Sequence, residues 1–218
     1  MNRDAGTRGF VAAVVLLCLA ACGPTRYTEY RAQPQSVPLL ERSVAMHVGR
    51  AFYRPTPGCA VVMPVVGKAA PRLRHAVETA LYRHLVTKLP NVVGPRIRRR
   101  EVRKLAIDLR QETDRALLTR ALRCPVLVEA KIWQSSEDFA LVYSRKNLDL
   151  EIVMLRRDRL LWKGRHNADR SDGGLPLSPL SAPFAVARAS RLHGDGDAMI
   201  SLVDDTVRRI VGSLPDVR

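Results

Sequence analysis

Histidine is the residue type most often used for metal binding and acid–base catalysis, and this chain spaces its histidines far apart. They are His47, His75, His84, His166 and His193. None of them stands in a His-Glu-x-x-His frame or beside cysteines at the spacing of zinc ligands. Because a catalytic zinc ion needs three protein ligands brought together, the sequence predicts no metal site.

Other short motifs of enzymes and cofactor sites are incomplete in this chain. Asp195 and Asp197 alternate with glycines, but the bidentate glutamate of a calcium loop does not follow. Gly67-Lys68 lacks the earlier glycine and the following hydroxyl of a phosphate loop. No Gly-x-Ser-x-Gly elbow of a serine hydrolase occurs. We therefore expect no cofactor, and a role in binding or assembly rather than in catalysis.

Basic residues are crowded into one short stretch of a chain whose net charge is +15. They are Arg96, Arg98, Arg99, Arg100, Arg103 and Lys104. On a helix, like charges at this spacing repel each other by a few tenths of a kcal/mol per pair. The stretch is either the solvated face of an arginine-rich helix or a patch that binds an anionic partner.

An apolar run near the amino terminus indicates the compartment. Arg3 and Arg8 precede it, it is too short to span a bilayer comfortably, and small residues stand before Cys22. These are the features of a signal peptide, which we place at residues 1–21. Since an exported chain does not meet DNA or RNA, we expect no nucleic-acid partner despite the positive charge.

The end of this run, Leu19-Ala20-Ala21-Cys22, resembles the lipobox of bacterial lipoproteins. The resemblance implies that Cys22 carries palmitate-type acyl chains, which together make membrane attachment effectively permanent. Gly23 stands where many enteric lipoproteins of the inner membrane have aspartate. The resemblance therefore implies attachment to the inner leaflet of the outer membrane, with the protein facing the periplasm. The alternative is ordinary secretion, with Cys22 as a spare thiol.

Residues 22–57 are rich in proline and polar residues, and we expect them to form a lipidated tether. One short alternating run, residues 44–48, is compatible with an edge strand. An extended segment of about 20 residues reaches on the order of 60 Å. Such a tether would hold the folded domain well clear of the membrane.

Residues 58–218 show the periodicities of a single periplasmic α/β domain. Strands are expected at 60–66, 92–93 and 124–133, a hairpin at 148–162, and helices at 71–89, 98–108, 113–122 and 197–214. This order predicts a mixed sheet of about five strands covered by helices. The first three strands should be parallel, and the hairpin antiparallel.

Three segments of this domain resemble a group of envelope proteins, namely the amino-terminal domain of TolB, CsgG and the lipoprotein activators of penicillin-binding proteins. The segments are residues 59–66, residues 124–132, and residues 148–162, which end in Leu-Trp. The resemblance implies the same fold over most of residues 59–214. The chain departs from the group at Arg123-Cys124-Pro125, where a Gly-Ala-Asp-like turn is common. It also lacks the insertion that builds the curli pore, so channel formation is not implied.

In this fold the runs after Cys59 and Cys124 are neighbouring parallel strands that start at the same edge of the sheet. Neighbouring strands lie about 4.8 Å apart, and a disulfide requires α-carbons about 4.4 to 6.8 Å apart. Cysteines in an oxidising compartment are seldom left reduced. We therefore predict a disulfide between Cys59 and Cys124.

A loop that begins at Gly173 carries three leucines among turn-forming residues: Leu175, Leu177 and Leu180. It either folds back on the core or offers an apolar contact to a partner.

These observations predict a non-catalytic outer-membrane lipoprotein that binds or helps to assemble a cell-envelope complex for secretion, cell-wall synthesis or polysaccharide export. The partner would be an envelope protein or anionic cell-wall or lipid material, with the oligomeric state left open. The alternative is a periplasmic hydrolase whose site is assembled from scattered residues. A pocket with convergent polar groups of shifted pKa would favour the hydrolase, whereas a flat apolar or basic patch would favour the binding protein.

Overall fold

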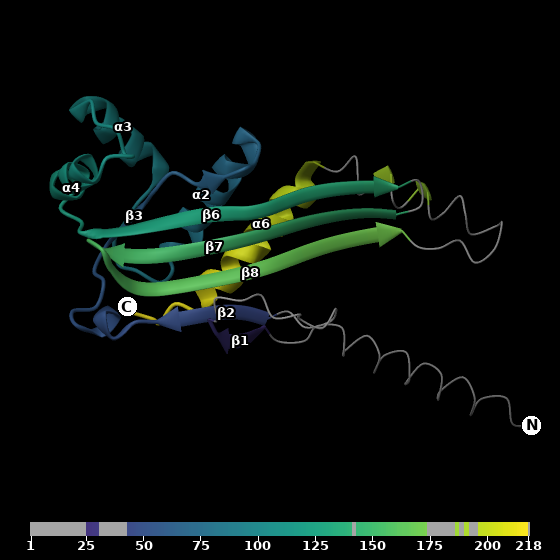
Figure 1. Ribbon diagram of the computed structural model, residues 1–218, viewed down its shortest axis with the longest axis horizontal. Helices are drawn as coiled ribbons and strands as arrows, with labels where there is room; N and C mark the ends of the chain where they lie inside the picture. Colours follow the sequence, from purple (N-terminus) through teal and green to yellow (C-terminus); the bar gives the residue numbers. More distant parts are fainter. Residues whose placement is uncertain are drawn as a thin grey trace, which may run out of the picture.

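A computed structural model of the chain describes residues 25–30, 43–140, 143–173, 186–187, 190–191 and 196–217. These residues form an eight-stranded mixed sheet with the strand order β1-β2-β8-β7-β6-β3-β5, in which β4 pairs with β6 (Figure 1). The α/β class is confirmed, but the expected number of about five strands is too low. Two of the additional strands, at residues 26–29 and 66–67, are too short for apolar periodicity to mark them, whereas the strand at residues 43–48 contains the alternating run at residues 44–48.

Three long antiparallel strands make up the centre of the sheet. They are β6 (Val126–Ala140), β7 (Tyr143–Arg156) and β8 (Arg159–Gly173). The turn between β7 and β8 falls at Arg157-Asp158, as the polar run in the sequence predicts. The strands extend further than expected because backbone hydrogen bonds between β6 and β7 continue to Ala140, beyond the last apolar alternation.

Parallel strands flank β6 on its other side. β3 (Ala60–Val62) pairs in parallel with both β6 and β5 (Val92–Val93), which confirms the predicted parallel arrangement of the first three strands. β4 (Val66–Gly67) also pairs in parallel with β6. Gly67 has a φ of 120°, and a Cβ atom there would lie 2.1 Å from the carbonyl oxygen of Ile132. Only glycine fits at this position.

Two strands lie within the segment that we expected to be a tether. β2 (Ser43–Val48) pairs antiparallel with β8, and β1 (Arg26–Glu29) pairs in parallel with β2 at the edge of the sheet. A short helical turn, η1 (Arg50–Tyr53), follows and buries Phe52 completely. Residues 26–29 and 43–48 of the expected tether therefore belong to the sheet, and only two residues separate Cys22 from Thr25, where the described chain begins.

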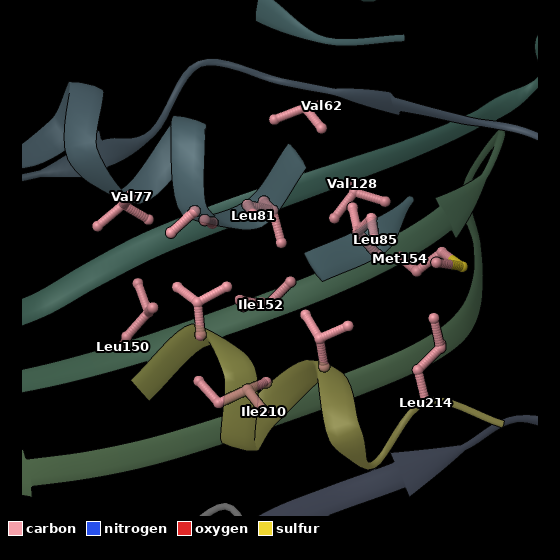
Figure 2. Close-up of a cluster of buried hydrophobic side chains, with 14 of the residues drawn as sticks. Val62, Val77, Leu81, Leu85, Val128, Leu150, Ile152, Met154, Ile210 and Leu214 are labelled. Carbon is pink, nitrogen blue, oxygen red and sulfur yellow. The ribbon is translucent and has the colours of Figure 1, made fainter. Parts of the chain in front are cut away.

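The main hydrophobic core lies between one face of the sheet and two helices, α2 (Pro71–Leu85) and α6 (Gly196–Gly212). Figure 2 shows Leu81 of α2, Ile152 of β7 and Ile210 of α6 in this cluster, and all three are fully buried. Full burial of one such side chain contributes roughly 1.5 to 3 kcal/mol. The helices expected at 71–89 and 197–214 are thus present, and both bury apolar residues. Among the described residues, no helix has both the length and the apolar character needed to cross a bilayer.

A second, smaller core lies on the opposite face, at the end of the sheet that contains β3 and β5. There α3 (Pro95–Leu105) and α4 (Glu112–Ala121) cover a cluster that includes Val61, Leu118 and Leu127. α3 begins three residues earlier than expected because Pro95 occupies its first turn, where a missing N–H group costs nothing.

The predicted disulfide is present beside this second core. The sulfur atoms of Cys59 and Cys124 are bonded, and their α-carbons lie 5.8 Å apart. The two cysteines stand just before β3 and β6, which are adjacent and parallel with Val61 opposite Leu127. The disulfide therefore ties together the starts of two strands that are 65 residues apart in the chain.

Candidate functional site

The face of β6, β7 and β8 that points away from α2 and α6 is the most distinctive surface of the described chain. Along β7, every second residue is buried in the main core, and the residues between them point to the other side. The helices α3 and α4 pack only on the end of that side nearest to β3. We call its uncovered part the open face, and it comprises Tyr30, Lys131, Trp133, Asp149, Glu151, Lys163 and Arg165.

Strand register brings the charges of the open face together in alternating sign. Glu151 on β7 lies opposite Lys131 on β6 and opposite Arg165 on β8. Opposite charges that face each other across neighbouring strands attract and stabilise the register. These residues are far apart in the sequence, and the sheet alone makes them neighbours.

Arg165 and Asp149 form a bidentate ion pair. The Nε and Nη2 atoms of Arg165 donate hydrogen bonds to the two carboxylate oxygens of Asp149, at 2.9 and 2.6 Å. These hydrogen bonds raise the pKa of Arg165 above its ordinary value, although partial burial acts in the opposite direction. Because the geometry is bidentate, it fixes the direction of the guanidinium group as well as its charge.

Glu151 is held by Tyr30 and Lys163. The hydroxyl of Tyr30 donates a hydrogen bond of 2.5 Å to Oε2 of Glu151, and Nζ of Lys163 lies 3.2 Å from the same oxygen. Nζ of Lys163 also lies 4.1 Å from the centroid of the Tyr30 ring. Burial lowers the pKa of Lys163, but the contacts with Tyr30 and Glu151 outweigh it and the net shift is upward. Glu151, only 7% exposed, is thus matched by a cation.

Trp133 is the one large apolar side chain set among these charges, and 48% of it is exposed. It sits at a β-bulge, where the register of β6 shifts between Ile132 and Gln134. Nζ of Lys131 lies 3.3 Å from its ring centroid, and the guanidinium carbon of Arg165 lies 5.1 Å away. A bulge re-aims a side chain, and cations beside an indole hold it by about 0.5 to 1 kcal/mol each at exposed sites.

Both carboxylates of the open face are paired with cations, Asp149 with Arg165 and Glu151 with Lys163. What the face presents outward is an indole ring with guanidinium and ammonium groups beside it. Trp, Tyr and Arg are the residue types that contribute most to binding energy at protein interfaces.

The predicted basic cluster divides into a buried member and an exposed remainder. Arg98 is only 3% exposed, and its Nη2 atom lies 3.0 Å from Oε2 of Glu78. Its Nη1 atom donates a hydrogen bond of 2.6 Å to the carbonyl oxygen of Val62. Burial lowers the pKa of Arg98, and the attraction of Glu78 opposes this shift. Arg98 therefore joins α3 to α2 and β3, and its expected place on an anion-binding surface is wrong.

The other members of the cluster remain exposed on α3, and Glu101 partly matches them. Its carboxylate oxygens lie 3.6 Å from Nε of Arg100 and 3.7 Å from Nζ of Lys104. The remaining basic residues are exposed as well: Arg96, Arg99 and Arg103. Whether this surface binds an anion stays a prediction.

Other predicted site residues lie outside the described part of the chain or are used for structure. Cys22 and the leucines of the predicted partner loop, Leu175, Leu177 and Leu180, lie outside the described residues. Within the described part, no cluster of three or more His, Cys, Asp or Glu side chains could hold a metal ion. His84 and His166 are hydrogen-bonded separately, to Asp204 and to the carbonyl oxygen of Ser43.

A groove of about 600 Å³ lies between α4 and the β7–β8 turn, with Arg115, Arg123 and Asp158 among its walls. Groups with raised or lowered pKa values are Arg98, Lys163, Arg165, His166 and Asp205.

The open face was missed at the sequence level. The alternation of Asp149 and Glu151, and of Lys163 and Arg165, indicates a solvent-facing side of each strand but not their pairing. Combining the two alternations across the predicted turn places Gly164 opposite Glu151. The register shift between Met154 and Leu155 moves the pairing by one residue, so that Arg165 lies opposite Glu151. No sequence signal connects Tyr30 with Glu151, since 121 residues separate them.

Comparison with known proteins gives structural likeness only. No family model and no curated protein matches the chain. The PelC dodecamer from Paraburkholderia phytofirmans is similar at 12% identity and a TM-score of 0.42, over 77% of this chain and 96% of that one. Lipoprotein GNA1162 from Neisseria meningitidis is similar at 9% identity and a TM-score of 0.43, over 60% of this chain and 94% of that one.

A putative lipoprotein from Caulobacter crescentus is similar at 10% identity and a TM-score of 0.33, over 69% of this chain and 84% of that one. Two of these three proteins are thus described as lipoproteins. Likeness at this level carries no argument about function. The proposals below rest on the residues of this chain.

Proposed function

We propose that this chain is a non-catalytic, lipid-anchored protein of the bacterial outer membrane that faces the periplasm and binds a protein of a cell-envelope complex through the open face. The observation that carries the proposal is the position of Trp133. Its indole ring is exposed and contacts Lys131 and Arg165, and the two carboxylates on the same face are paired with cations. An isolated exposed tryptophan has few stabilising contacts, whereas this one is pre-positioned. Pre-positioning reduces the entropy that is lost when a partner binds.

Two further observations support this assignment. The engagement of Asp149 and Glu151 by cations argues for binding rather than for proton transfer on this face. The element order β3-α2-β5-α3-α4-β6 supports a relation to the TolB amino-terminal domain, CsgG and the penicillin-binding-protein activators. On this proposal the partner belongs to the secretion, cell-wall or polysaccharide systems of the envelope.

The disulfide and the start of β1 support export and anchoring. A disulfide between the partly buried Cys59 and the buried Cys124 suits an oxidising compartment such as the periplasm. The described chain begins three residues after Cys22, so an acyl group there would attach directly to the folded domain.

Anchoring is tested by Cys22→Ser. We expect the variant to lose all incorporation of a palmitate analogue and to retain its signal peptide, because no thiol remains to be acylated. Labelling followed by gel fluorescence measures this. Cys18→Ser is the matched control, since it changes a cysteine of the predicted signal peptide and should leave the label unchanged. A label that persists in Cys22→Ser would refute the lipobox assignment.

Partner binding is tested by photo-crosslinking from the open face. A photoreactive phenylalanine analogue at Trp133 should give a discrete adduct with an envelope protein in living cells. The same analogue at Tyr82, an aromatic residue of α2 that is 40% exposed, is the matched control and should not give that adduct. Mass spectrometry of the adduct identifies the partner.

Affinity for the partner so identified should then fall by at least 30-fold in Trp133→Ala, as is typical when a central tryptophan of an interface is removed. Tyr82→Ala should leave this affinity within twofold of the unsubstituted protein. Titration calorimetry or surface plasmon resonance measures both. Equal adduct yields at residues 133 and 82, or unchanged affinity in Trp133→Ala, would contradict the proposal.

A further inference from the structure

The amino-terminal edge of the sheet lies unusually close in sequence to the predicted anchor. Thr25 is three residues after Cys22, and three residues of extended chain span at most about 11 Å. The position of Thr25 relative to the rest of the fold is fixed, because Nη1 of Arg209 on α6 donates a hydrogen bond to its Oγ1 atom. The predicted acylation site therefore lies within about 11 Å of the folded domain.

β1 is itself fastened to the sheet and to α6. All four of its residues pair with β2, from Arg26 opposite Ser43 to Glu29 opposite Met46. The hydroxyl of Tyr27 donates a hydrogen bond of 3.4 Å to the carbonyl oxygen of Arg209. Because β1 is hydrogen-bonded to both β2 and α6, it does not separate from the sheet to lengthen the tether.

The surface around this point is suited to lipid headgroups. Tyr27 is 45% exposed, and tyrosine is enriched at membrane interfaces because its ring is apolar and its hydroxyl is polar. The side chain of Arg208 is 58% exposed, and a guanidinium group presents several donors that match phosphate. Its ion pair with Asp205 uses only part of this capacity.

Two carboxylates of α6 near this surface are paired with arginines, whereas Glu29 at the end of β1 is exposed. Asp205 is paired with both Arg208 and Arg209, and its pKa is lowered because these hydrogen bonds outweigh the effect of burial. Asp204 on the same helix is paired with Arg83 at 3.0 Å. The charges of Asp204 and Asp205 are each matched by at least one arginine.

We infer that β1 and the carboxyl-terminal half of α6 form a membrane-contact edge, with Tyr27 and Arg208 in the headgroup layer of the bilayer that holds the anchor. The inference rests on the proposed acylation of Cys22. It adds the orientation of the domain, with the β1 edge of the sheet against the lipid and the α3 end directed away from it.

Lipid photo-crosslinking in the full chain tests this orientation. A photoreactive phenylalanine analogue is placed at Tyr27, at Arg208, or at Ile97 of α3, which is 45% exposed at the opposite end of the sheet order. Adducts with a tritiated phospholipid should be at least tenfold more abundant at residues 27 and 208 than at residue 97. Two positions on different elements keep the test valid if one variant is poorly folded.

A second arm changes the spacer. Insertion of about 20 Gly and Ser residues between Gly23 and Pro24 adds a flexible coil with an average span of roughly 25 Å. The lipid adducts at residues 27 and 208 should then fall several-fold, while incorporation of the palmitate analogue stays the same.

The two arms separate this inference from the proposed function. Adduct yields that are equal at residues 27, 208 and 97 in a protein that carries the palmitate label would overturn the orientation and leave the anchoring intact. The same conclusion would follow if the insertion changed nothing. Absence of the label from the unsubstituted protein would overturn both.

Discussion

Arg98→Ala is expected to lower the free energy of unfolding by about 3 to 5 kcal/mol, the usual cost of removing one partner of a buried ion pair. The substitution leaves the carboxylate of Glu78 buried without its cation and removes the donor to the carbonyl oxygen of Val62. Chemical denaturation of the Cys22→Ser form, followed by circular dichroism, measures the loss. Typical domains have a free energy of unfolding of about 5 to 15 kcal/mol, so this substitution would remove a large part of the stability of the domain.

Arg99→Ala is the matched control for this prediction. Arg99 is the next residue on α3 but is exposed, and a surface substitution of this kind usually changes stability by less than about 0.5 kcal/mol. The double variant Arg98→Met with Glu78→Leu should recover much of the loss, because no charge is then left buried. If Arg98→Ala cost no more than Arg99→Ala, the ion pair would not be structurally important.

Loss of the disulfide should have an effect of similar size. The bond closes a loop of 65 residues, for which the chain-entropy estimate gives about 4 kcal/mol of stabilisation. Cys59→Ala, Cys124→Ala and the double variant should therefore lower the melting temperature by nearly the same amount, because each removes the same bond. Differential scanning calorimetry measures the three melting temperatures.

Thiol chemistry supplies the control for the disulfide. In denatured Cys22→Ser protein that has not been reduced, neither Cys59 nor Cys124 should react with a maleimide, whereas both should react after reduction. Reduction of this protein should also reproduce the melting temperature of the double variant. Reaction of either thiol before reduction, or clearly additive effects of the two single substitutions, would argue against the bond.

The features that the sequence predicted correctly depend on local patterns. The apolar runs after Cys59 and Cys124 are long enough to mark β3 and β6, whereas their pairing was predicted from the expected fold. The polar turn at Arg157-Asp158 lies between two alternating runs and marks the β7–β8 hairpin. The residues that mark each strand and the turn are neighbours in the sequence.

The features that were missed depend on contacts between distant segments. Arg98 stands in a run of basic residues and has the sequence appearance of a surface residue, but Glu78 on another helix makes its burial favourable. β1 has no buried residue, so backbone pairing forms this strand without an apolar pattern, and it places β2, the run compatible with an edge strand, inside the sheet. The position of Trp133 depends on a bulge, which is defined only by its pairing with β7.

The register of the sheet also limits how far from the membrane a partner can be. Thr28, Ala45, Arg165, Glu151 and Lys131 lie opposite one another in a single row across five strands. Four strand spacings of about 4.8 Å separate the ends of this row by roughly 19 Å. Extended chain from Cys22 to Thr28 adds at most about 21 Å. With Cys22 acylated, every protein that docks on the open face has to approach within roughly 40 Å of the membrane that holds the acyl chains, a much shorter distance than a free tether would allow.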